Sequence, residues 1–419
     1  MKRLSALAPF HYGVAGFFIS LIVQIIAIGE YLNNAILSDI SPLAVDAYQY
    51  AEYATNWRND GFTEAFSDLL RTPGYPALIY VFTLIFPSTP YLAVKIFQLI
   101  LVGLSVGVLS YIISRYFKGK RTVLYSLFIS LIPIWHFTPQ LLAESVCFFL
   151  ITIILLFLQY LAVSNKYIKI VISISIAFGL MVYFKPNNII FVLFILFSFI
   201  IVNIKKSIQY TSLFLSVLFV VLLPWFIYAE KTQGEFFSLA NSKGENLYIG
   251  TGMPSGQSTN QVLVDSAKKW RVSQEFNILD GVKIDPTLPR QQMDELFLDK
   301  AFKIWKERPL QQIGFSIDKI LIAFGLKTNS LKDLALGVYN LLGLLSAILI
   351  LRKKEFQNVG EQTLIIAVLL AIQAALFQVD RRFIISILPP LASVSIFLAS
   401  LTILTRIRQK LLVKSANYF

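Results

Sequence analysis

The sequence predicts an all-α integral membrane protein with about 10 transmembrane helices, interfacial helices in a first outer loop, and a small α-rich region on the outer side. Of its 419 residues, 56% are hydrophobic and only 15% are charged, and the mean hydropathy is +0.67. One water-soluble core cannot hide that much apolar surface. Phe and Tyr number 35 and 19, a bias typical of rings that face acyl chains or lie at the membrane interface.

The length of each apolar run identifies the spans, because a transmembrane helix needs about 20 apolar residues. Two stretches, 74–86 and 313–326, are too short, since prolines close the first and Asp318 and Lys319 interrupt the second. We expect both to lie at the interface. The predicted spans are residues 12–29, 91–116, 121–139, 141–162, 167–184, 187–204, 208–229, 333–351, 361–379 and 383–405.

The basic residues predict which side of the membrane each loop occupies. The formal net charge is +13, and most Lys and Arg residues form short clusters beside apolar segments, as cytoplasmic loops do. This distribution indicates membrane orientation, and we expect no nucleic-acid partner. It places both termini in the cytoplasm and two long loops, 30–90 and 230–332, outside. The clusters are residues 2–3, 115–121, 166–169, 205–206, 352–354 and 406–410.

The loops divide the chain into three predicted regions. Residues 1–229 form a transmembrane region that includes the first outer loop, and residues 230–332 form the second outer loop. Residues 333–419 form the C-terminal transmembrane helices. The second loop is too short to need a soluble core of its own, because about 100 residues on a membrane scaffold can use the scaffold's surface.

Asp46 is the first candidate site residue. It lies just beyond the first span on the predicted outer side, where a carboxylate can deprotonate an acceptor hydroxyl or help to hold a metal ion. Asp is also a preferred helix N-cap, and a helix-compatible stretch follows it. From the residues alone, the cap is the favoured interpretation.

Glu144 is the second candidate, at the predicted outer end of a span. A carboxylate that faces lipid there costs about 1 to 3 kcal/mol, so we expect the side chain to face the protein interior or a wet cavity. A structural hydrogen bond to a neighbouring helix and a role in a site explain this position equally well.

Cations at the outer edges of three spans break the positive-inside pattern. They are Arg71, Lys185, and the adjacent pair Arg381 and Arg382. Such groups can clamp a phosphate of a lipid-linked donor and neutralise charge on the leaving group. Any one of them alone is explained by snorkelling to lipid headgroups. Three positions at the same depth favour a phosphate pocket.

Several kinds of chemistry lack their sequence signals. His11 and His136 have no metal-ligand partners at helical spacing, so we predict no metal site from them. Cys147 is the one cysteine, which excludes an intrachain disulfide. The chain has no Walker loop, no GxGxxG and no Ser-His-Asp arrangement, so nucleotide hydrolysis and dinucleotide redox chemistry are poor hypotheses.

Four stretches in order resemble a known superfamily. The chain is similar to the membrane glycosyltransferases of the C-type superfamily, in the branch of bacterial family 39 related to protein mannosyltransferases and the lipid A aminoarabinose transferase. Residues 301–306, Pro309 and Lys319 match the segment before the later spans. The four stretches are Asp46-x-x-x-Tyr50-x-x-x-Ala54 with Gly61-Phe62 and 71–76; Ala143-Glu144; Leu223-Pro-Trp225 followed by 234–236, Ser238 and 244–250; and Arg382-Phe383 with Pro389-Pro390.

This resemblance implies a function and a set of roles. It implies inverting transfer of a single sugar from a polyprenyl-phosphate donor to a glycan, lipid or protein acceptor, at the periplasmic or exterior face of the plasma membrane. Asp46 is then the catalytic base or the carboxylate that positions the acceptor, and we expect Glu144 to be a second catalytic carboxylate. Ala47 replaces the usual acidic neighbour of the aspartate, which argues against a metal held there, although a divalent cation stays open. The implied substrate contacts are Tyr50, Tyr75, Asn246 and Tyr248.

Two other functions compete with this one. An O-antigen type polymerase or ligase also combines many spans, a large outer loop and arginines, but acts on lipid-diphosphate oligosaccharides. A transporter of lipid-linked sugars needs polar groups and broken helices at mid-span. Because the predicted spans are apolar in their middles and the charges gather at one face, the pattern favours surface chemistry over transport.

Overall fold

The computed structural model describes residues 2–31, 45–115, 120–131, 140–251, 290–326, 331–353 and 357–376, with residue 288 and short helical pieces between 387 and 403. These residues form helices and turns, with no strand among them. The N-terminal half contains α1 (Lys2–Tyr31), α2 (Val45–Asp60), α3 (Phe62–Ala65), α4 (Gly74–Ile85), α5 (Pro90–Ser114), α6 (Lys120–Ser130), α7 (Glu144–Leu161), α8 (Tyr167–Phe184), a 3-10 helix (Pro186–Phe191) and α9 (Val192–Val202). The remainder contains α10 (Ser207–Gln233), α11 (Lys243–Thr251), α13 (Arg290–Glu307), α14 (Pro309–Ala323), α15 (Leu331–Ile350) and α16 (Gln357–Leu376).

Six of the described helices are long and apolar enough to cross a membrane, as expected for a multi-pass protein. The predicted span 167–184 coincides with α8, whereas 187–204 begins as a 3-10 helix, because Pro186 interrupts the helical hydrogen bonding. Part of the predicted span 121–139 and most of 383–405 lie outside the described residues. The six helices include Pro9–Ala27 of α1, together with α5, α7, α8, α10 and α16.

The two short apolar stretches form helices that are too short to cross upright. Helix α4 has 12 residues and α14 has 15, which correspond to about 18 Å and 22 Å at the rise of an α-helix. The hydrocarbon core is about 30 Å thick. Their lengths therefore agree with the interfacial positions expected from the sequence.

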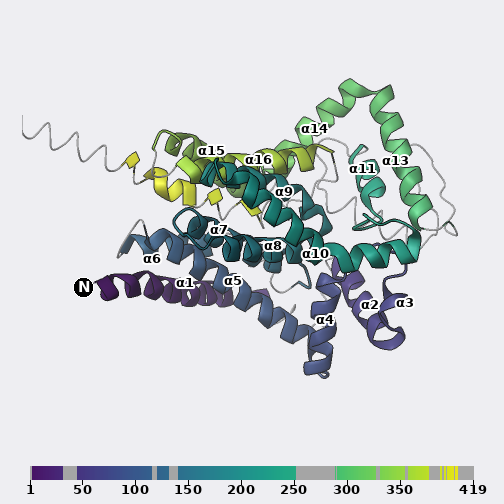
Figure 1. The fold of residues 1–419 in the computed structure, drawn as a ribbon, viewed down its shortest axis with the longest axis horizontal. Coiled ribbons are helices and arrows are strands. Elements are labelled where there is room, and N and C mark those ends of the chain that lie inside the picture. Colours follow the sequence, from purple (N-terminus) through teal and green to yellow (C-terminus); the bar gives the residue numbers. More distant parts are fainter. Residues whose placement is uncertain are drawn as a thin grey trace, which may run out of the picture.

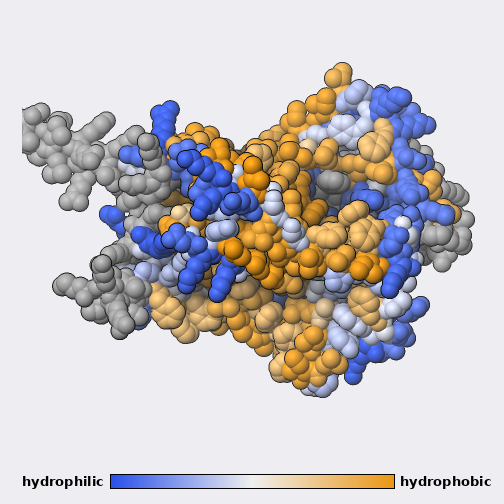
Figure 2. All heavy atoms as spheres, in the orientation of Figure 1, coloured by the Kyte–Doolittle hydropathy of each residue, from blue (hydrophilic) through white to orange (hydrophobic). Residues whose placement is uncertain are grey.

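The long helices run side by side, and a group of mostly shorter helices lies at one end (Figure 1). Helices α1, α5, α7, α8 and α10 pack successively, α5 on α1, α7 on α5, α8 on α7 and α10 on α8. Helices α2 to α4, α11 and α13 lie at the end opposite the N-terminus, which we call the loop end. Figure 2 shows hydrophobic residues over the middle of the molecule and hydrophilic residues towards its two ends. The site described below lies at the loop end.

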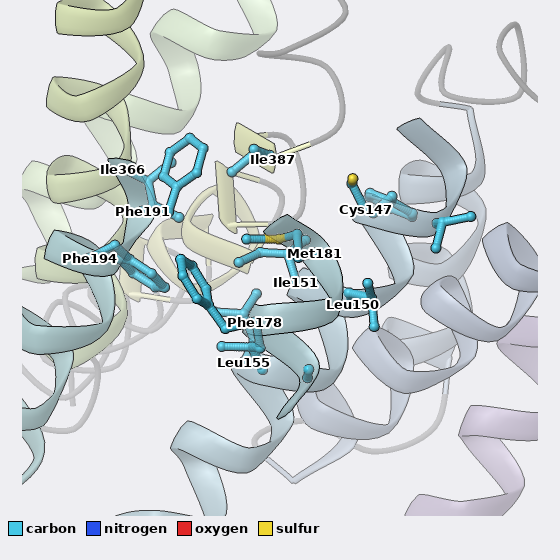
Figure 3. Packing of buried hydrophobic residues seen from close by; sticks show 14 of the residues in the cluster. Cys147, Leu150, Ile151, Leu155, Phe178, Met181, Phe191, Phe194, Ile366 and Ile387 are labelled. Carbon is cyan, nitrogen blue, oxygen red and sulfur yellow. The ribbon is translucent and has the colours of Figure 1, made fainter. Parts of the chain in front are cut away.

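The core of the bundle is apolar and continuous from α7 to α16. Figure 3 shows Ile151 and Leu155 of α7 near Phe178 and Met181 of α8, and Ile366 of α16 belongs to the same buried cluster. Close backbone approach at Gly13 and Gly107 lets α1 pack on α5, as small residues do at membrane helix interfaces.

A second, smaller core lies at the loop end. Tyr248 of α11 packs on Phe297 of α13, with ring centroids 5.3 Å apart. Helix α14 holds the end of α11, because Lys319 Nζ donates a hydrogen bond to the Gly250 carbonyl at 2.9 Å and Gln312 donates one to Thr251 at 3.0 Å. Helix α14 is in turn tied to the candidate span α16, because Ser316 Oγ donates a hydrogen bond to the Ala375 carbonyl at 3.0 Å. The division of the chain into three regions, with boundaries at residues 229 and 332, stays a prediction.

Gly74 permits a close contact between α4 and α8. An added Cβ at Gly74 would lie 2.5 Å from the carbonyl carbon and oxygen of Tyr183 in α8. We expect Gly74→Ala to lower the free energy of unfolding by about 1 to 3 kcal/mol, because backbone atoms have to move apart. Detergent-solubilised protein in a thermal or denaturant unfolding experiment measures this change.

Gly314 of α14 is the matched control, since nothing lies within 4 Å of its added Cβ. Gly314→Ala should leave stability unchanged or raise it by up to about 1 kcal/mol, the difference in helix propensity. Equal stability of the Gly74→Ala variant and the wild type would contradict the close contact.

Candidate active site

The first component of the site is a pair between Arg71 and Asp46. Arg71 Nη2 donates to Asp46 Oδ1 at 2.5 Å, and its Nε donates to Gln49 Oε1 at 3.0 Å. Asp46 and Gln49 lie one turn apart on α2, and the guanidinium lies over the Tyr50 ring at 5.3 Å. The side chains of Arg71 and Asp46 are 27% and 26% exposed. A ligand at the surface can therefore reach both.

The turn that carries Arg71 is held from two sides. Leu69 has a positive φ of 52°, a conformation that a non-glycine residue keeps only when its surroundings enforce it. Tyr53 Oη donates to both carboxylate oxygens of Asp68, at 2.6 and 2.7 Å. The Asn241 backbone N–H donates to the Leu69 carbonyl at 2.9 Å. Segments of the two predicted loops, 30–90 and 230–332, thus fix the position of Arg71 jointly.

The second component is a buried pair between Glu144 and Lys185. Lys185 Nζ donates to Glu144 Oε1 at 2.9 Å, and the side chains are 12% and 3% exposed. Glu144 is the first residue of α7, where the helix dipole favours a negative charge. Pro186 restricts Lys185 to an extended backbone, with φ −152° and ψ 100°, which ends α8 at this point.

Tyr75 and Gln98 connect the two pairs. The Tyr75 ring lies 4.8 Å from that of Tyr50, beneath Arg71. Its hydroxyl donates to Gln98 Oε1 at 2.6 Å, and Gln98 Nε2 donates to the Gln140 carbonyl at 2.7 Å, one turn before Glu144. Burial, with the negative charge of Glu144 as a smaller cause, raises the pKa of Tyr75 well above its ordinary value. The phenol therefore stays protonated and keeps its donor role.

The two pairs are electrically balanced. Burial lowers the pKa of Arg71, but the charge of Asp46, with smaller effects of Tyr50 and Tyr53, raises it by more, so the net pKa shift is upward. Arg71 is consequently charged at any working pH. One carboxylate accompanies each cation, and the four charges sum to zero.

The structure brings together six of the residues expected from the sequence, and it revises one interpretation. Asp46 lies inside α2, where it accepts from Arg71, so the interpretation as an N-cap that precedes the helix is wrong. Glu144 faces the protein interior, as expected. The six residues are Asp46, Tyr50, Arg71, Tyr75, Glu144 and Lys185.

The other expected residues lie elsewhere. Arg381 and Arg382 are outside the described residues. Asn246 donates to the Ser242 carbonyl at 2.6 Å within the start of α11, and Tyr248 is buried in the small core. Their roles as substrate contacts stay predictions. Among the residues that the structure describes, no group of three or more His, Cys, Asp or Glu side chains is placed to hold a metal ion.

Two buried polar residues of α5 were not predicted from the sequence. Lys95 and Gln98 are 1% and 0% exposed, and both lie near the loop end of a helix that reads as an ordinary apolar span. No motif marks them. Their spacing of three residues, which places them on neighbouring parts of one helix face, is the signal that could have found them.

Comparison with known proteins supports this architecture. Residues 71–228, less than half of the chain, match the family model of dolichyl-phosphate-mannose-protein mannosyltransferases. The archaeal oligosaccharyltransferase AglB from Archaeoglobus fulgidus, solved with an inhibitory peptide and a dolichol-phosphate, superposes with a TM-score of 0.52 at 13% identity. That alignment covers 97% of this chain but 52% of AglB, so the chain spans about half of that protein. No curated protein sequence matches the chain.

A second solved protein is also similar. ArnT from Cupriavidus metallidurans, bound to undecaprenyl phosphate, aligns with a TM-score of 0.44 at 14% identity, over 91% of this chain and 77% of ArnT. Its apo form aligns with a TM-score of 0.40 at 13% identity, over 90% and 76%. The described residues form an all-α membrane protein with the fold of AglB, and the match of residues 71–228 to the mannosyltransferase family model agrees with the resemblance found in the sequence.

Proposed function

We propose that the protein is a glycosyltransferase that moves a single sugar from a polyprenyl-phosphate donor to a glycan, lipid or protein acceptor, at the non-cytoplasmic face of the plasma membrane. The observation that carries the proposal is that two carboxylate–cation pairs, Asp46–Arg71 and Glu144–Lys185, lie at one end of an apolar bundle and are linked through Tyr75 and Gln98. The match of residues 71–228 to a mannosyltransferase family supports it.

The donor phosphate binds at the two cations. Arg71 uses Nη2 and Nε for Asp46 and Gln49, and the structure shows no hydrogen bond from Nη1 to any described residue. This edge of the guanidinium can accept a phosphate oxygen while the other edge stays bound to α2. Lys185 supplies a second positive charge from α8. Arg381 and Arg382, which the sequence places at the same edge, complete the neutralisation of the phosphate.

The transfer is a single displacement at the anomeric carbon. Asp46 takes the proton of the acceptor hydroxyl as its oxygen attacks, and the bond between the anomeric carbon and the phosphate oxygen breaks. The polyprenyl phosphate leaves with the bonding electron pair, and Arg71 and Lys185 stabilise its charge. Attack opposite the leaving group inverts the anomeric centre. Glu144 holds Lys185 in place and is the second carboxylate of the site.

The apolar bundle supplies the environment for the donor's lipid. Large apolar side chains remain exposed on the outside of the long helices, among them Phe18, Ile26 and Val220. In a membrane this surface faces acyl chains. The donor's tail lies in the same medium, so the phosphate enters the site at the boundary between lipid and water.

Reconstitution in liposomes tests the proposed donor. Purified protein is incubated with radiolabelled polyprenyl-phosphate sugars and a cell-envelope extract as the source of acceptor. We expect label to leave the lipid fraction, free polyprenyl phosphate to appear, and the product to gain the mass of one sugar. Transfer of a whole oligosaccharide from a lipid diphosphate, with no use of the monophosphate donors, would support the polymerase or ligase instead.

A further inference from the structure

Gln98 is a buried amide whose hydrogen bonds run in two directions. It lies on α5, fully buried, between α4 and the turn that precedes α7. Its oxygen accepts from the Tyr75 hydroxyl at 2.6 Å, and its nitrogen donates to the Gln140 carbonyl at 2.7 Å. An amide in an apolar span is costly unless both of its ends are satisfied. Here both ends are.

Each end of this bridge leads to one ion pair. Tyr75 follows Arg71 by four residues, and its ring packs on Tyr50, over which the guanidinium lies. Gln140 precedes Glu144 by four residues. The short turn between them is closed by a further hydrogen bond to the Gln140 carbonyl, which the Leu142 backbone N–H donates at 2.9 Å. Gln98 therefore stands between two groups that lie far apart in the sequence.

The chemistry of the bridge differs from that of ordinary packing. Apolar contacts between α4, α5 and α7 hold the helices together but tolerate small shifts along their axes. Hydrogen bonds of 2.6 and 2.7 Å are directional, so they favour one register. Arg71 lies three residues before α4, and Lys185 ends α8, which packs on both α4 and α7, so a fixed register of these helices also fixes the positions of the two cations.

We propose that Gln98 is a positioning residue for sugar transfer, whose amide sets the spacing of the Asp46–Arg71 and Glu144–Lys185 pairs so that one donor phosphate meets both cations. This inference rests on the proposed function. Gln98 touches neither substrate nor reacting atoms. It acts through Tyr75 on one side and through the Gln140 turn on the other.

Two substitutions remove the bridge in different ways. Gln98→Met keeps the volume and loses both hydrogen bonds, whereas Tyr75→Phe keeps the ring packing and loses only the hydroxyl. Because a misplacement of about 1 Å can cost 100-fold in rate, we expect each variant to lower kcat about 10- to 100-fold. Each should also weaken binding of polyprenyl phosphate, used alone as the probe, by about 10-fold. The double variant should lose no more than the worse single variant.

Gln24 supplies the control for the loss of a buried amide. It is 1% exposed in α1, and its nitrogen donates to Ser20 Oγ at 3.1 Å and to the Leu99 carbonyl at 3.4 Å. Gln24→Met should leave kcat and polyprenyl phosphate binding unchanged, whatever its effect on the melting temperature. All measurements are made at a temperature at which every variant is folded, as judged by its unfolding curve.

Distinct results separate this inference from the function on which it rests. Wild-type kcat and binding in folded Gln98→Met and Tyr75→Phe proteins, or a lowered melting temperature as the sole change, would overturn the positioning role. Strictly additive losses in the double variant would overturn it as well. Failure of the wild-type protein to use any polyprenyl-phosphate sugar would instead remove the proposed function.

Discussion

We expect the Asp46→Asn protein to transfer sugar about 10²- to 10⁴-fold more slowly than the wild type, the usual contribution of a general base. Asn keeps the shape of Asp, and its oxygen can still accept from Arg71 Nη2, so the fold of the outer loop is retained. Arg71 loses its counter-charge, and affinity for polyprenyl phosphate should be equal to or greater than that of the wild type. Single-turnover transfer and lipid-phosphate binding in liposomes measure the two effects separately.

Asp60 gives a matched control on the same helix. It ends α2 and is exposed, so Asp60→Asn removes one negative charge without touching the pair. Its kcat and donor affinity should equal those of the wild type. Near wild-type transfer by Asp46→Asn would eliminate Asp46 as the base, and a joint loss of transfer and donor binding would indicate a structural role instead.

Breaking the Glu144–Lys185 pair should have the largest effect on stability. Lys185→Met removes the cation that donates to Glu144 Oε1, whose side chain is 3% exposed. Removal of one partner of a buried pair typically costs about 3 to 5 kcal/mol, because the remaining charge is uncompensated. The same variant loses a cation of the proposed phosphate site, so donor affinity falls too. Denaturant unfolding and polyprenyl phosphate binding report the two losses.

A double substitution separates stability from function at this pair. Glu144→Leu with Lys185→Met removes both charges, and stability should return towards the wild-type value. Donor binding should stay weak, because the cation is still missing. The exposed pair Lys303–Glu307, 3.9 Å apart at 74% and 54% exposure, is the control. Lys303→Met should change stability by about 0.5 kcal/mol or less. A double variant with normal transfer would exclude both residues from the site.

The spans were predictable because the requirement they satisfy is local. An apolar run of sufficient length crosses a bilayer whatever its neighbours are, and the predicted 167–184 coincides with α8. The C-terminal end of α8 was equally predictable, since Pro186 restricts the backbone of the residue before it. The end of α10 was harder to predict from the sequence. It continues to Gln233, four residues past the predicted span, because helix formation persists beyond the apolar stretch until Gly234 takes a left-handed conformation.

Gln98 shows that a hydropathy pattern does not reveal a bridging residue inside an apolar helix. A single amide in a 25-residue apolar helix barely changes its hydropathy, so nothing in the local sequence distinguishes a bridging residue from a tolerated one. Its partners, Tyr75 and the Gln140 carbonyl, come from segments 23 and 42 residues away. Only the packing of three helices makes the residue significant.

By itself, the sequence determined the membrane class and the positions of Asp46, Arg71, Glu144 and Lys185 near the ends of apolar segments, because charged groups are excluded from lipid and the lengths of the runs set where they emerge. The tertiary structure decided which carboxylate meets which cation. Arg71 pairs with Asp46 across 25 residues and Lys185 with Glu144 across 41. These choices depend on the close approach of α4 to α8 at Gly74 and on the Tyr75–Gln98 hydrogen bond, which are contacts between distant segments that no local pattern encodes.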